Sequence, residues 1–256
     1  MTLSEITKQL LNENNIHINK RLGQNFLIDH GVLDRIVDAA NVKKSDKILE
    51  IGTGLGVLTK ELALSSKKVI TLDVDNQLLQ VTKNYLNAFK NIEYVNESIL
   101  KYKLPKSINK VVANLPYYIT SPVIQKLLDL KGIDLIVLTI QREVAERIVA
   151  GPGSKTFGSF SVYVQAHAEA SINSFVPKSA FIPQPDVGSA ILVLKSFKKS
   201  PYKINFDLVR AGFGKRRKTL RNSLSEYEVD FDAAGIDPGR RAETLSLEEW
   251  ERLSSH

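Results

Sequence analysis

The segment Lys47-Ile48-Leu49-Glu50-Ile51-Gly52-Thr53-Gly54-Leu55-Gly56 decides the fold of this chain. Its apolar half reads as a buried strand, and its second half is a glycine-rich turn that opens a helical pattern. Glycines in such a turn let the backbone approach a ligand closely. The segment therefore predicts a nucleotide-binding strand, turn and helix, although a simple tight turn without a ligand is the alternative.

The spacing of these glycines favours one nucleotide cofactor over another. A dinucleotide-binding loop has its third glycine one position later, where Val57 stands. The G-x-G-x-G pattern, with Glu50 before it, favours S-adenosylmethionine over NAD. Gly52 and Gly54 are the expected cofactor-binding residues of the loop.

Short β-branched runs alternate with helix-length amphipathic segments along the first two thirds of the chain. The expected strands cover residues 47–51, 68–72, 92–95, 110–113 and 133–140. The expected crossover helices cover residues 55–65, 76–89, 121–130 and 142–149. This alternation predicts an α/β fold with a doubly wound, Rossmann-like parallel sheet.

The alternation of strand and helix segments ends after Ala150, where a glycine-rich turn begins. Late strands at residues 170–176 and 190–194 are expected to end the sheet as an antiparallel pair. A polar linker follows, and helical segments are expected at residues 206–213, 215–224 and 247–253. We expect a cofactor-binding catalytic domain over residues 1–195 and a small helical domain over residues 196–256.

The composition restricts the partners and the compartment. The chain has 256 residues, with 35 Lys and Arg against 28 Asp and Glu, and its net charge of +7 suits a polyanionic partner or simply solubility. The absence of cysteine excludes disulfides and thiolate chemistry, and we expect no metal site. With no apolar signal core and no membrane-length apolar run, we expect a cytoplasmic protein that binds no membrane.

Acidic and polar side chains follow the next two strands. Asp73 ends the second strand about twenty residues after the glycine loop, where a carboxylate accepts hydrogen bonds from ribose hydroxyls. Asp75 lies on the same turn and reads as a helix-start acid. After the third strand, either Glu97 or Ser98 is placed to contact the cofactor adenine, unless it only caps the turn.

Asn114-Leu115-Pro116-Tyr117 follows the fourth strand, at the sheet edge where α/β proteins bind ligands. An exocyclic adenine nitrogen is a poor nucleophile because its lone pair is delocalised. The Asn114 side-chain oxygen and the Leu115 carbonyl can hold its hydrogens, Pro116 stiffens the turn, and Tyr117 offers a stacking ring. An Asn-Pro turn with a packed tyrosine is the alternative.

Together these motifs resemble the ribosomal RNA adenine N6-dimethyltransferase family, from about Lys20 to Trp250, and most closely its small-subunit dimethyladenosine transferase branch. The resemblance rests on Glu50 to Gly54, Asp73, Asn114 to Tyr117, Gly23-Gln24-Asn25-Phe26-Leu27, Gln141 to Ala145, Gly151 to Lys155, Phe181-Ile182-Pro183-Gln184-Pro185, Arg216 to Arg221 and Gly235 to Pro238.

The resemblance implies a fold, a reaction and further site residues. It implies S-adenosylmethionine-dependent dimethylation of two adjacent adenosines in the terminal hairpin of small-subunit ribosomal RNA, by a monomer acting in ribosome biogenesis on the assembling subunit. It places Asn25, Leu27, Gly52, Asp73, Glu97 or Ser98, and Asn114 in the cofactor pocket, and Tyr117 and Phe181 on the two faces of the target adenine. Ser98 and Asp186 depart from the usual Asp and basic residue.

Basic residues concentrate between Lys198 and Arg221, where nine stand against one acid, Asp207. Phe213, Leu220 and Leu224 form one apolar stripe on the expected helix, so the cations beside it face outward. The expected RNA-binding residues are Lys215, Arg216, Arg217, Lys218 and Arg221. A solvated helix face without an RNA role is the alternative.

Two rival functions share these features. One is a large-subunit ribosomal RNA methylase of the antibiotic-resistance type. The other is an RNA-binding assembly or transcription factor that keeps the fold without catalysis, against which the intact Asn114 and Tyr117 argue.

Overall fold

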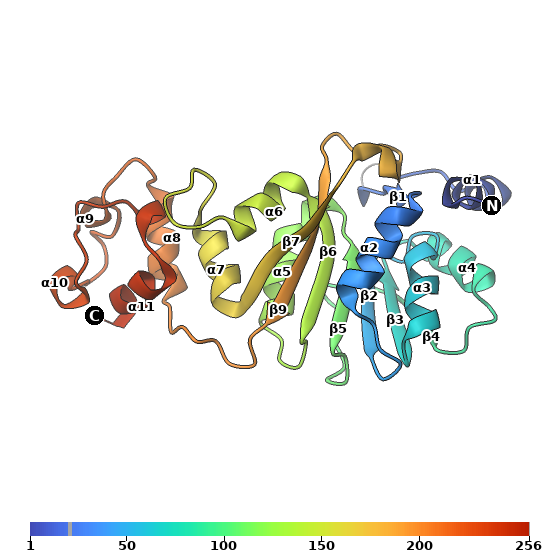
Figure 1. Cartoon of the computed structure of the whole chain (residues 1–256), viewed down its shortest axis with the longest axis horizontal. Coiled ribbons are helices and arrows are strands. Elements are labelled where there is room, and N and C mark those ends of the chain that lie inside the picture. The colour runs from blue at the N-terminus through green and yellow to red at the C-terminus, as the bar shows by residue number, and fades with distance from the viewer. Residues whose placement is uncertain (20–21, 256) are drawn as a thin grey trace. The chain divides into compact units, whose positions relative to one another are not determined.

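The computed structural model describes residues 1–19 and 22–255, so Lys20, at the start of the resembling stretch, lies outside the described residues, as do Arg21 and His256. Its centre is a seven-stranded sheet in the order β4-β3-β2-β5-β6-β9-β7 (Figure 1). The strands are β2 (Lys47–Ile51), β3 (Lys68–Asp73), β4 (Ile92–Asn96), β5 (Lys110–Asn114), β6 (Leu135–Gln141), β7 (Ala168–Val176) and β9 (Ser189–Ser196). A separate pair joins β1 (Phe26–Leu27) to β8 (Phe181–Ile182).

The helices are α1 (Leu3–Glu13), α2 (His30–Ala40), α3 (Val57–Ser65), α4 (Asn76–Tyr85), α5 (Thr120–Leu128), α6 (Arg142–Val149), α7 (Ser159–His167), α8 (Phe206–Gly214), α9 (Leu220–Ser223), α10 (Phe231–Ala234) and α11 (Leu247–Ser255). Short 3-10 turns are η2 (Tyr117–Ile119), η3 (Lys178–Ala180) and η4 (Ala242–Thr244). Among the described residues, no helix combines the length and the apolar character that crossing a bilayer requires.

The strand directions confirm the predicted α/β fold. β2, β3, β4, β5 and β6 run parallel to one another, and β9 runs antiparallel to β6. The sheet therefore becomes antiparallel at β6 and β9, and the other expected late strand, β7, lies beside β9 at the edge.

The register of the sheet positions the site. Ile51 is paired with Leu72 on one side and with Ala113 on the other. Parallel strands in register end at the same edge, so the residues that follow β2, β3 and β5 lie side by side there.

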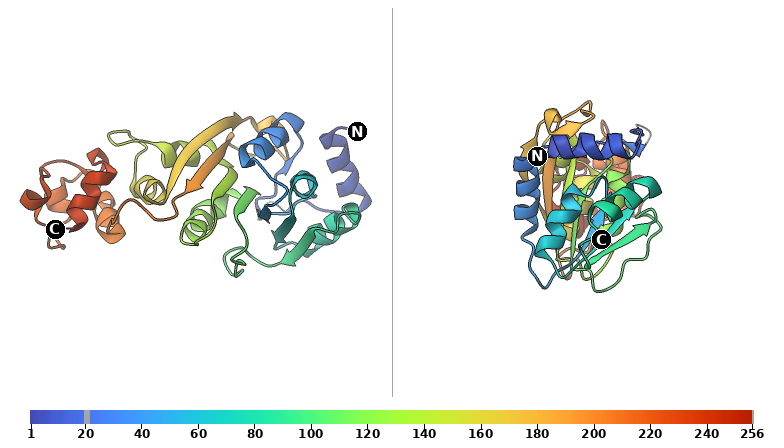
Figure 2. Two further views of the ribbon diagram at one scale, coloured as in Figure 1. Left: turned by 60° about the horizontal axis from the view of Figure 1, so that its bottom comes forward. Right: turned by 90° about the vertical axis from the view of Figure 1, so that its right-hand side faces the viewer.

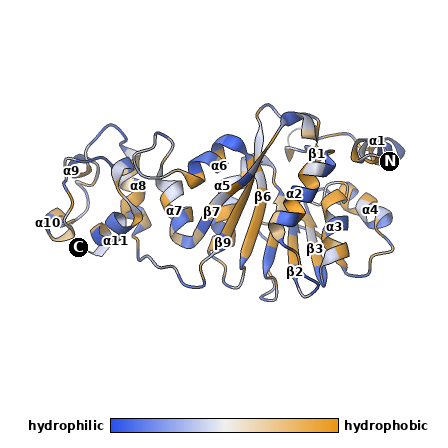
Figure 3. Cartoon of the chain, in the orientation of Figure 1, coloured by the Kyte–Doolittle hydropathy of each residue, from blue (hydrophilic) through white to orange (hydrophobic). Residues whose placement is uncertain are grey.

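The chain divides into two compact units. Unit 1 comprises Met1–Arg142 and Ser171–Ser196, and unit 2 comprises Glu143–Ala170 and Phe197–His256. In unit 1, α2 and α3 pack their apolar faces on the sheet, with Leu33 and Ile36 of α2 and Leu62 of α3 fully or almost fully buried (Figures 1 and 2). The buried strands appear as apolar ribbons in Figure 3 because both of their faces are covered.

Unit 2 has its own core. Trp250 is fully buried and packs on Phe213, whose ring also meets Phe157 edge-on at 5.9 Å between ring centroids. Phe157 and Val162 belong to this cluster together with the C-terminal helices. The predicted boundary at residue 195 therefore differs from the division in the structure, because residues 143–170 contribute their apolar side chains to the core of unit 2.

The expected helix over residues 215–224 is wrong. α8 ends at Gly214, a turn closes with the Lys218 amide donating to the Lys215 carbonyl (2.8 Å), and only the four residues of α9 follow. The apolar residues of the predicted stripe, Phe213, Leu220 and Leu224, are nevertheless buried in unit 2. Apolar periodicity thus identified the buried positions but not the break in the helix.

Candidate active site

A pocket opens at the carboxyl ends of β2, β3 and β5, entirely within unit 1. Its lining comes from five stretches of chain that the sheet register brings together. These are residues 22–27, 51–55 with 57–58, 72–74 with 78, 97–99 and 114–119.

The glycine loop lines this pocket with a backbone conformation that residues other than glycine rarely adopt. Gly52 and Gly54 have φ values of +84° and +54° and both line the pocket. Gly56, with φ +80°, packs instead against α4, where a Cβ atom would come within 2.5 Å of the Thr82 methyl group. The first two glycines therefore leave room for a ligand, and the third allows the helix to approach.

The two acids at the end of β3, Asp73 and Asp75, have different surroundings. Asp75 is the N-cap of α4 and accepts from the Gln77 amide (3.0 Å). Asp73 lines the pocket and accepts from the amides of Gly54 (3.2 Å) and Asp75 (2.9 Å). Burial raises the pKa of Asp73 even though these amides oppose the shift. A hydroxyl pair from a ribose would supply the donors that this desolvated carboxylate lacks.

Both candidates after β4 line the pocket, so the choice between them stays open. Ser98 accepts from the Leu100 amide through its hydroxyl oxygen (3.3 Å), which is the turn-capping role. The Glu97 side chain is exposed at the rim. Each can still accept a hydrogen bond from an adenine amino group.

Asn114 is the last residue of β5, and its side chain is oriented by a neighbouring loop. Its carboxamide nitrogen donates to the Asn25 carbonyl (3.0 Å), which leaves the carboxamide oxygen as the end that can accept from a ligand. Asn25 in turn donates through its own side chain to the Gly23 carbonyl (3.1 Å). The loop at residues 22–27 thus both lines the pocket and orients the Asn114 side chain.

The three residues after Asn114 are held by the end of the sheet. The Leu115 amide donates to the Thr139 carbonyl (3.1 Å), and Pro116, with a φ of −58°, precedes the turn η2. The Tyr117 hydroxyl lies 2.7 Å from the Ser189 hydroxyl on β9. Partial burial raises the pKa of Tyr117, so it is a neutral phenol at physiological pH. A neutral ring held at its tip is suited to stacking on a base.

Phe181 does not lie where the base-clamp prediction requires. Its ring is 1% exposed and packs in the main core of unit 1, and it is not among the residues that line the pocket. The pairing of β8 with β1 places it opposite Leu27, which does line the pocket. The prediction fails for this structure because the apolar ring is buried in the core rather than presented at the rim.

The pocket residues that the sequence did not identify as site residues include Gln24 and Tyr118. Gln24 lines the pocket and donates from its side-chain nitrogen to the Asp75 carboxylate (2.9 Å), which ties the loop to the start of α4. Tyr118 also lines the pocket and is 61% exposed. Two signals in the sequence could have identified these residues. Gln24 lies inside the Gly23 to Leu27 motif, and Tyr118 directly follows Tyr117.

The five basic residues predicted to bind RNA are all exposed, as that prediction requires, namely Lys215, Arg216, Arg217, Lys218 and Arg221. Arg216 donates to the Lys155 carbonyl (2.9 Å), and Lys215 pairs only loosely with Glu226 at 3.8 Å. The turn that carries them is anchored by Leu220, which is fully buried.

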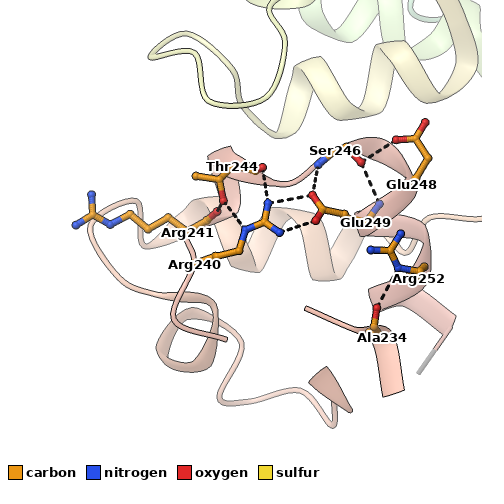
Figure 4. A network of polar contacts seen from close by, with 8 residues as sticks. All are labelled: Ala234, Arg240, Arg241, Thr244, Ser246, Glu248, Glu249 and Arg252. Atoms are coloured by element: carbon orange, nitrogen blue, oxygen red, sulfur yellow. Dashed lines mark hydrogen bonds and ion pairs between the residues drawn. The ribbon is translucent and has the colours of Figure 1, made fainter. Parts of the chain in front are cut away.

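A polar network holds the C-terminal part of unit 2 (Figure 4). The Arg240 guanidinium donates to both carboxylate oxygens of Glu249 and to the Thr244 carbonyl (2.7 Å). This pairing raises the pKa of Arg240 and lowers that of Glu249. Since these groups are engaged with one another, Arg240 is a structural cation and not part of the exposed basic set.

The pocket fits the nucleoside part of S-adenosylmethionine. It combines a positive-φ glycine floor that a Cβ would obstruct, a desolvated carboxylate on Asp73, and apolar walls from Leu72 and Ile99. The side-chain oxygen of Asn114 completes a site in which an amino group can be held beside the cofactor. This arrangement supports methyl transfer to a planar amine.

Comparisons with known proteins agree with this chemistry. A family model described as ribosomal RNA adenine dimethylase matches residues 15–256. Ribosomal RNA small subunit methyltransferase A of Alkaliphilus oremlandii is 40% identical over 273 residues, covering 98% of this chain and 95% of the relative.

Two solved structures are also similar along most of the chain. A dimethyladenosine transferase from Plasmodium falciparum has a TM-score of 0.80 at 28% identity, covering 89% of this chain and 95% of the other. The 23S rRNA methyltransferase ErmE has a TM-score of 0.75 at 26% identity, covering 90% and 98%.

Proposed function

Because this chain belongs to the ribosomal RNA adenine dimethylase family, we propose that it dimethylates two adjacent adenosines in the terminal hairpin of small-subunit ribosomal RNA. The enzyme is an S-adenosylmethionine-dependent ribosomal RNA adenine dimethyltransferase. The choice of subunit is supported by 40% identity to a small-subunit methyltransferase, against 26% to ErmE.

The observation that carries the proposed chemistry is the side-chain oxygen of Asn114 at the end of β5, beside the glycine loop and Asp73. Bound S-adenosylmethionine supplies an electrophilic methyl group. Asp73 holds the ribose hydroxyls, Gly52 and Gly54 let the backbone approach, and the Glu97 and Ser98 turn contacts the adenine of the cofactor.

Asn114 and Leu115 prepare the target amine. Their oxygens accept the two N6 hydrogens of the target adenine, which draws the nitrogen lone pair out of conjugation and aims it at the methyl carbon. The nitrogen–carbon bond forms as the sulfur–carbon bond breaks, and the sulfur keeps the electron pair. The cationic nitrogen then loses a proton to solvent, and the step repeats with one N–H remaining.

The proposal requires no protein base before attack, because the amine is neutral when it reacts. Alignment of the amine is then the main contribution of the protein. Pro116 stiffens the turn, and Tyr117, fixed by its contact with Ser189, stacks on the flipped base. The exposed basic turn of unit 2, residues 215–221, contacts RNA phosphates and positions the substrate.

The proposed partner is the assembling small ribosomal subunit, on which the enzyme acts as a monomer in the cytoplasm. The net charge of +7 and the exposed cations of unit 2 support a polyanionic partner of this kind.

The test is methylation of purified ribosomal subunits that lack these modifications, with radiolabelled S-adenosylmethionine as donor. We expect label in small-subunit RNA and in no large-subunit RNA, and dimethyladenosine as the product after nuclease digestion. Label confined to the large subunit would replace this proposal with the antibiotic-resistance type of activity.

The variant Asn114→Ala gives the matching test of the site. Removal of one preorganised polar group that holds the reacting amine costs on the order of 100-fold in kcat, whereas subunit binding should persist. Asn84→Ala, which removes an exposed asparagine from α4 outside the pocket, is the control and should methylate normally. Normal transfer by Asn114→Ala would disprove the acceptor role.

A further inference from the structure

We propose that Tyr118 is the stacking platform for the nucleotide next to the target adenine in the RNA. It is a positioning residue, and the inference rests on the proposed function, since a neighbouring base is present only when the substrate is a polynucleotide.

The first observation is the exposure of this ring at the mouth of the pocket. Tyr118 is 61% exposed and lines the pocket, whereas Leu115, on the same segment, is 2% exposed. An aromatic ring left in water forgoes the burial that stabilises most rings of its size. Such a ring at the rim of a binding site gains its burial when a ligand arrives.

The second observation is that the ring is supported from behind. A Cβ atom built on Gly23 would lie 3.6 Å from both Cδ1 and Cε1 of Tyr118, and 3.3 Å from the Cβ of Pro116. Gly23 has φ +64°, so the loop brings bare backbone against the ring. The Tyr118 ring is therefore backed by a glycine and not free to collapse onto that side.

The third observation is the fixed backbone beneath it. Tyr118 is the middle residue of η2, where the Ile119 amide donates to the Pro116 carbonyl (3.2 Å) and the Thr120 amide donates to the Tyr117 carbonyl. Thr120, which begins α5, is 2% exposed. A short turn anchored at both ends presents its central side chain with little conformational freedom to lose on binding.

The two adjacent tyrosines have different surroundings. The Tyr117 hydroxyl is bonded to Ser189 and its ring is partly buried, while the Tyr118 ring stands at the rim. When a base flips into a pocket, the base beside it loses a stacking partner. A rim aromatic replaces that partner without reading the sequence, because every base has a π-face.

The experiment compares Tyr118→Ala, Tyr118→Phe and Tyr118→Trp on undermethylated small subunits. We expect Tyr118→Ala to raise the KM for subunits about tenfold, which corresponds to 1.4 kcal/mol and lies within the range for one base–aromatic stack. The KM for S-adenosylmethionine and the thermal midpoint should stay at the wild-type values. Phe and Trp should restore the subunit KM to within about twofold, because the ring face is what binds.

The matched control is Tyr85→Ala, which changes the last residue of α4, outside the pocket, and should leave the subunit KM unchanged. An unchanged subunit KM in Tyr118→Ala would overturn the proposal. So would a rise only in the KM for S-adenosylmethionine, which would make the ring a cofactor wall, or failure of Phe and Trp to rescue.

Failure of the proposed substrate is distinguishable from failure of this inference. If the wild-type enzyme labels only large subunits, the variant series is run on those subunits. If Tyr118→Ala raises the KM for large subunits and Phe or Trp restores it, the stacking role is supported although the proposed substrate is abandoned. If Tyr118→Ala does not raise that KM, the stacking role is overturned as well.

Discussion

Glu50 illustrates how a single buried acid is used in this site. Its side chain is fully buried in β2, two residues before Gly52, and accepts from the Thr59 hydroxyl (2.6 Å). Burial raises the pKa of Glu50 to about 8, although its hydrogen bonds to Thr59 and Thr71 oppose the shift. The folded protein therefore holds a proton on Glu50 at neutral pH, while the unfolded chain does not.

This proton makes stability depend on pH in a defined direction. A folded-state pKa raised from 4.5 to about 8 means that the folded protein binds more protons than the unfolded chain between these values. The contribution of Glu50 to the free energy of unfolding is fully present below pH 4.5 and is lost as the pH rises towards 8. We expect Glu50→Gln, which keeps a neutral side chain, to flatten this decline, as measured by urea unfolding at pH 5, 6, 7 and 8.

Glu61→Gln on α3 is the control for the loss of a carboxyl group, and it should retain the wild-type decline between pH 5 and 8. An equally steep decline in Glu50→Gln would mean that Glu50 is ionised in the folded protein.

Residue identity was predictable from sequence where the chemistry restricts the residue type. Asp73 and Asn114 were identified because few side chains accept hydrogen bonds from ribose or amino groups at the end of a strand, and both lie in the pocket. Phe181 was misplaced because an aromatic ring suits a core as well as a base clamp, and only the packing decides. Tyr118 was missed for the same reason.

At the scale of the element, the turn between β2 and α3 depends on close packing against α4. A side chain on Gly56 would approach Thr82 Cγ2 at 2.5 Å and Leu86 Cδ1 at 3.2 Å, at a φ of +80° that other residues disfavour. The loop and the start of α3 would have to move away from α4. Because the Thr82 hydroxyl also donates to the Gly54 carbonyl (3.0 Å), the movement would reach the pocket floor.

We therefore expect Gly56→Ala to lower the free energy of unfolding by about 2–5 kcal/mol, the sum of the left-handed backbone strain and the overpacking. S-adenosylmethionine binding, measured by calorimetry, should weaken in parallel. Gly31→Ala in α2 adds the same methyl group at an ordinary φ with contacts of 3.4 Å or more, and should change neither quantity. Wild-type stability in Gly56→Ala would show that the loop tolerates displacement.

Strands were easier to predict than helices in this chain. The strand at residues 47–51 matches its predicted bounds because a strand covered on both faces has a largely apolar sequence. The helix at residues 142–149 also matches its predicted bounds. No helix was predicted before Lys47, although α1 and α2 lie there. The break after Gly214 depends on how Leu220 packs in unit 2, which periodicity does not encode.

At the scale of the whole molecule, chemistry and charge are distributed between the two units. The pocket is built by unit 1 alone, whereas the densest run of cations, residues 215–218, stands on unit 2. Those cations are exposed, and the nearby Arg240 is already engaged by Glu249. A phosphate-binding role would explain why the cations at residues 215–218 are exposed although Leu220, close by in sequence, is buried.

The double variant Arg217→Ala with Arg221→Ala tests this role, since neither side chain has a part in the core of unit 2 and both are exposed. Removing one cation that neutralises a phosphate should reduce the slope of log K against log salt concentration by about 1, so the slope for small-subunit binding should fall by about 2. The control removes the same charge elsewhere, with Lys67→Ala and Lys90→Ala, which are exposed just before β3 and β4 at the sheet edge opposite the pocket. If only the arginine pair lowers the slope, the turn of unit 2 contacts the RNA backbone. If both double variants lower the slope equally, binding reflects the net charge alone. An unchanged slope in the arginine pair would mean that this turn is a solvated surface without an RNA role.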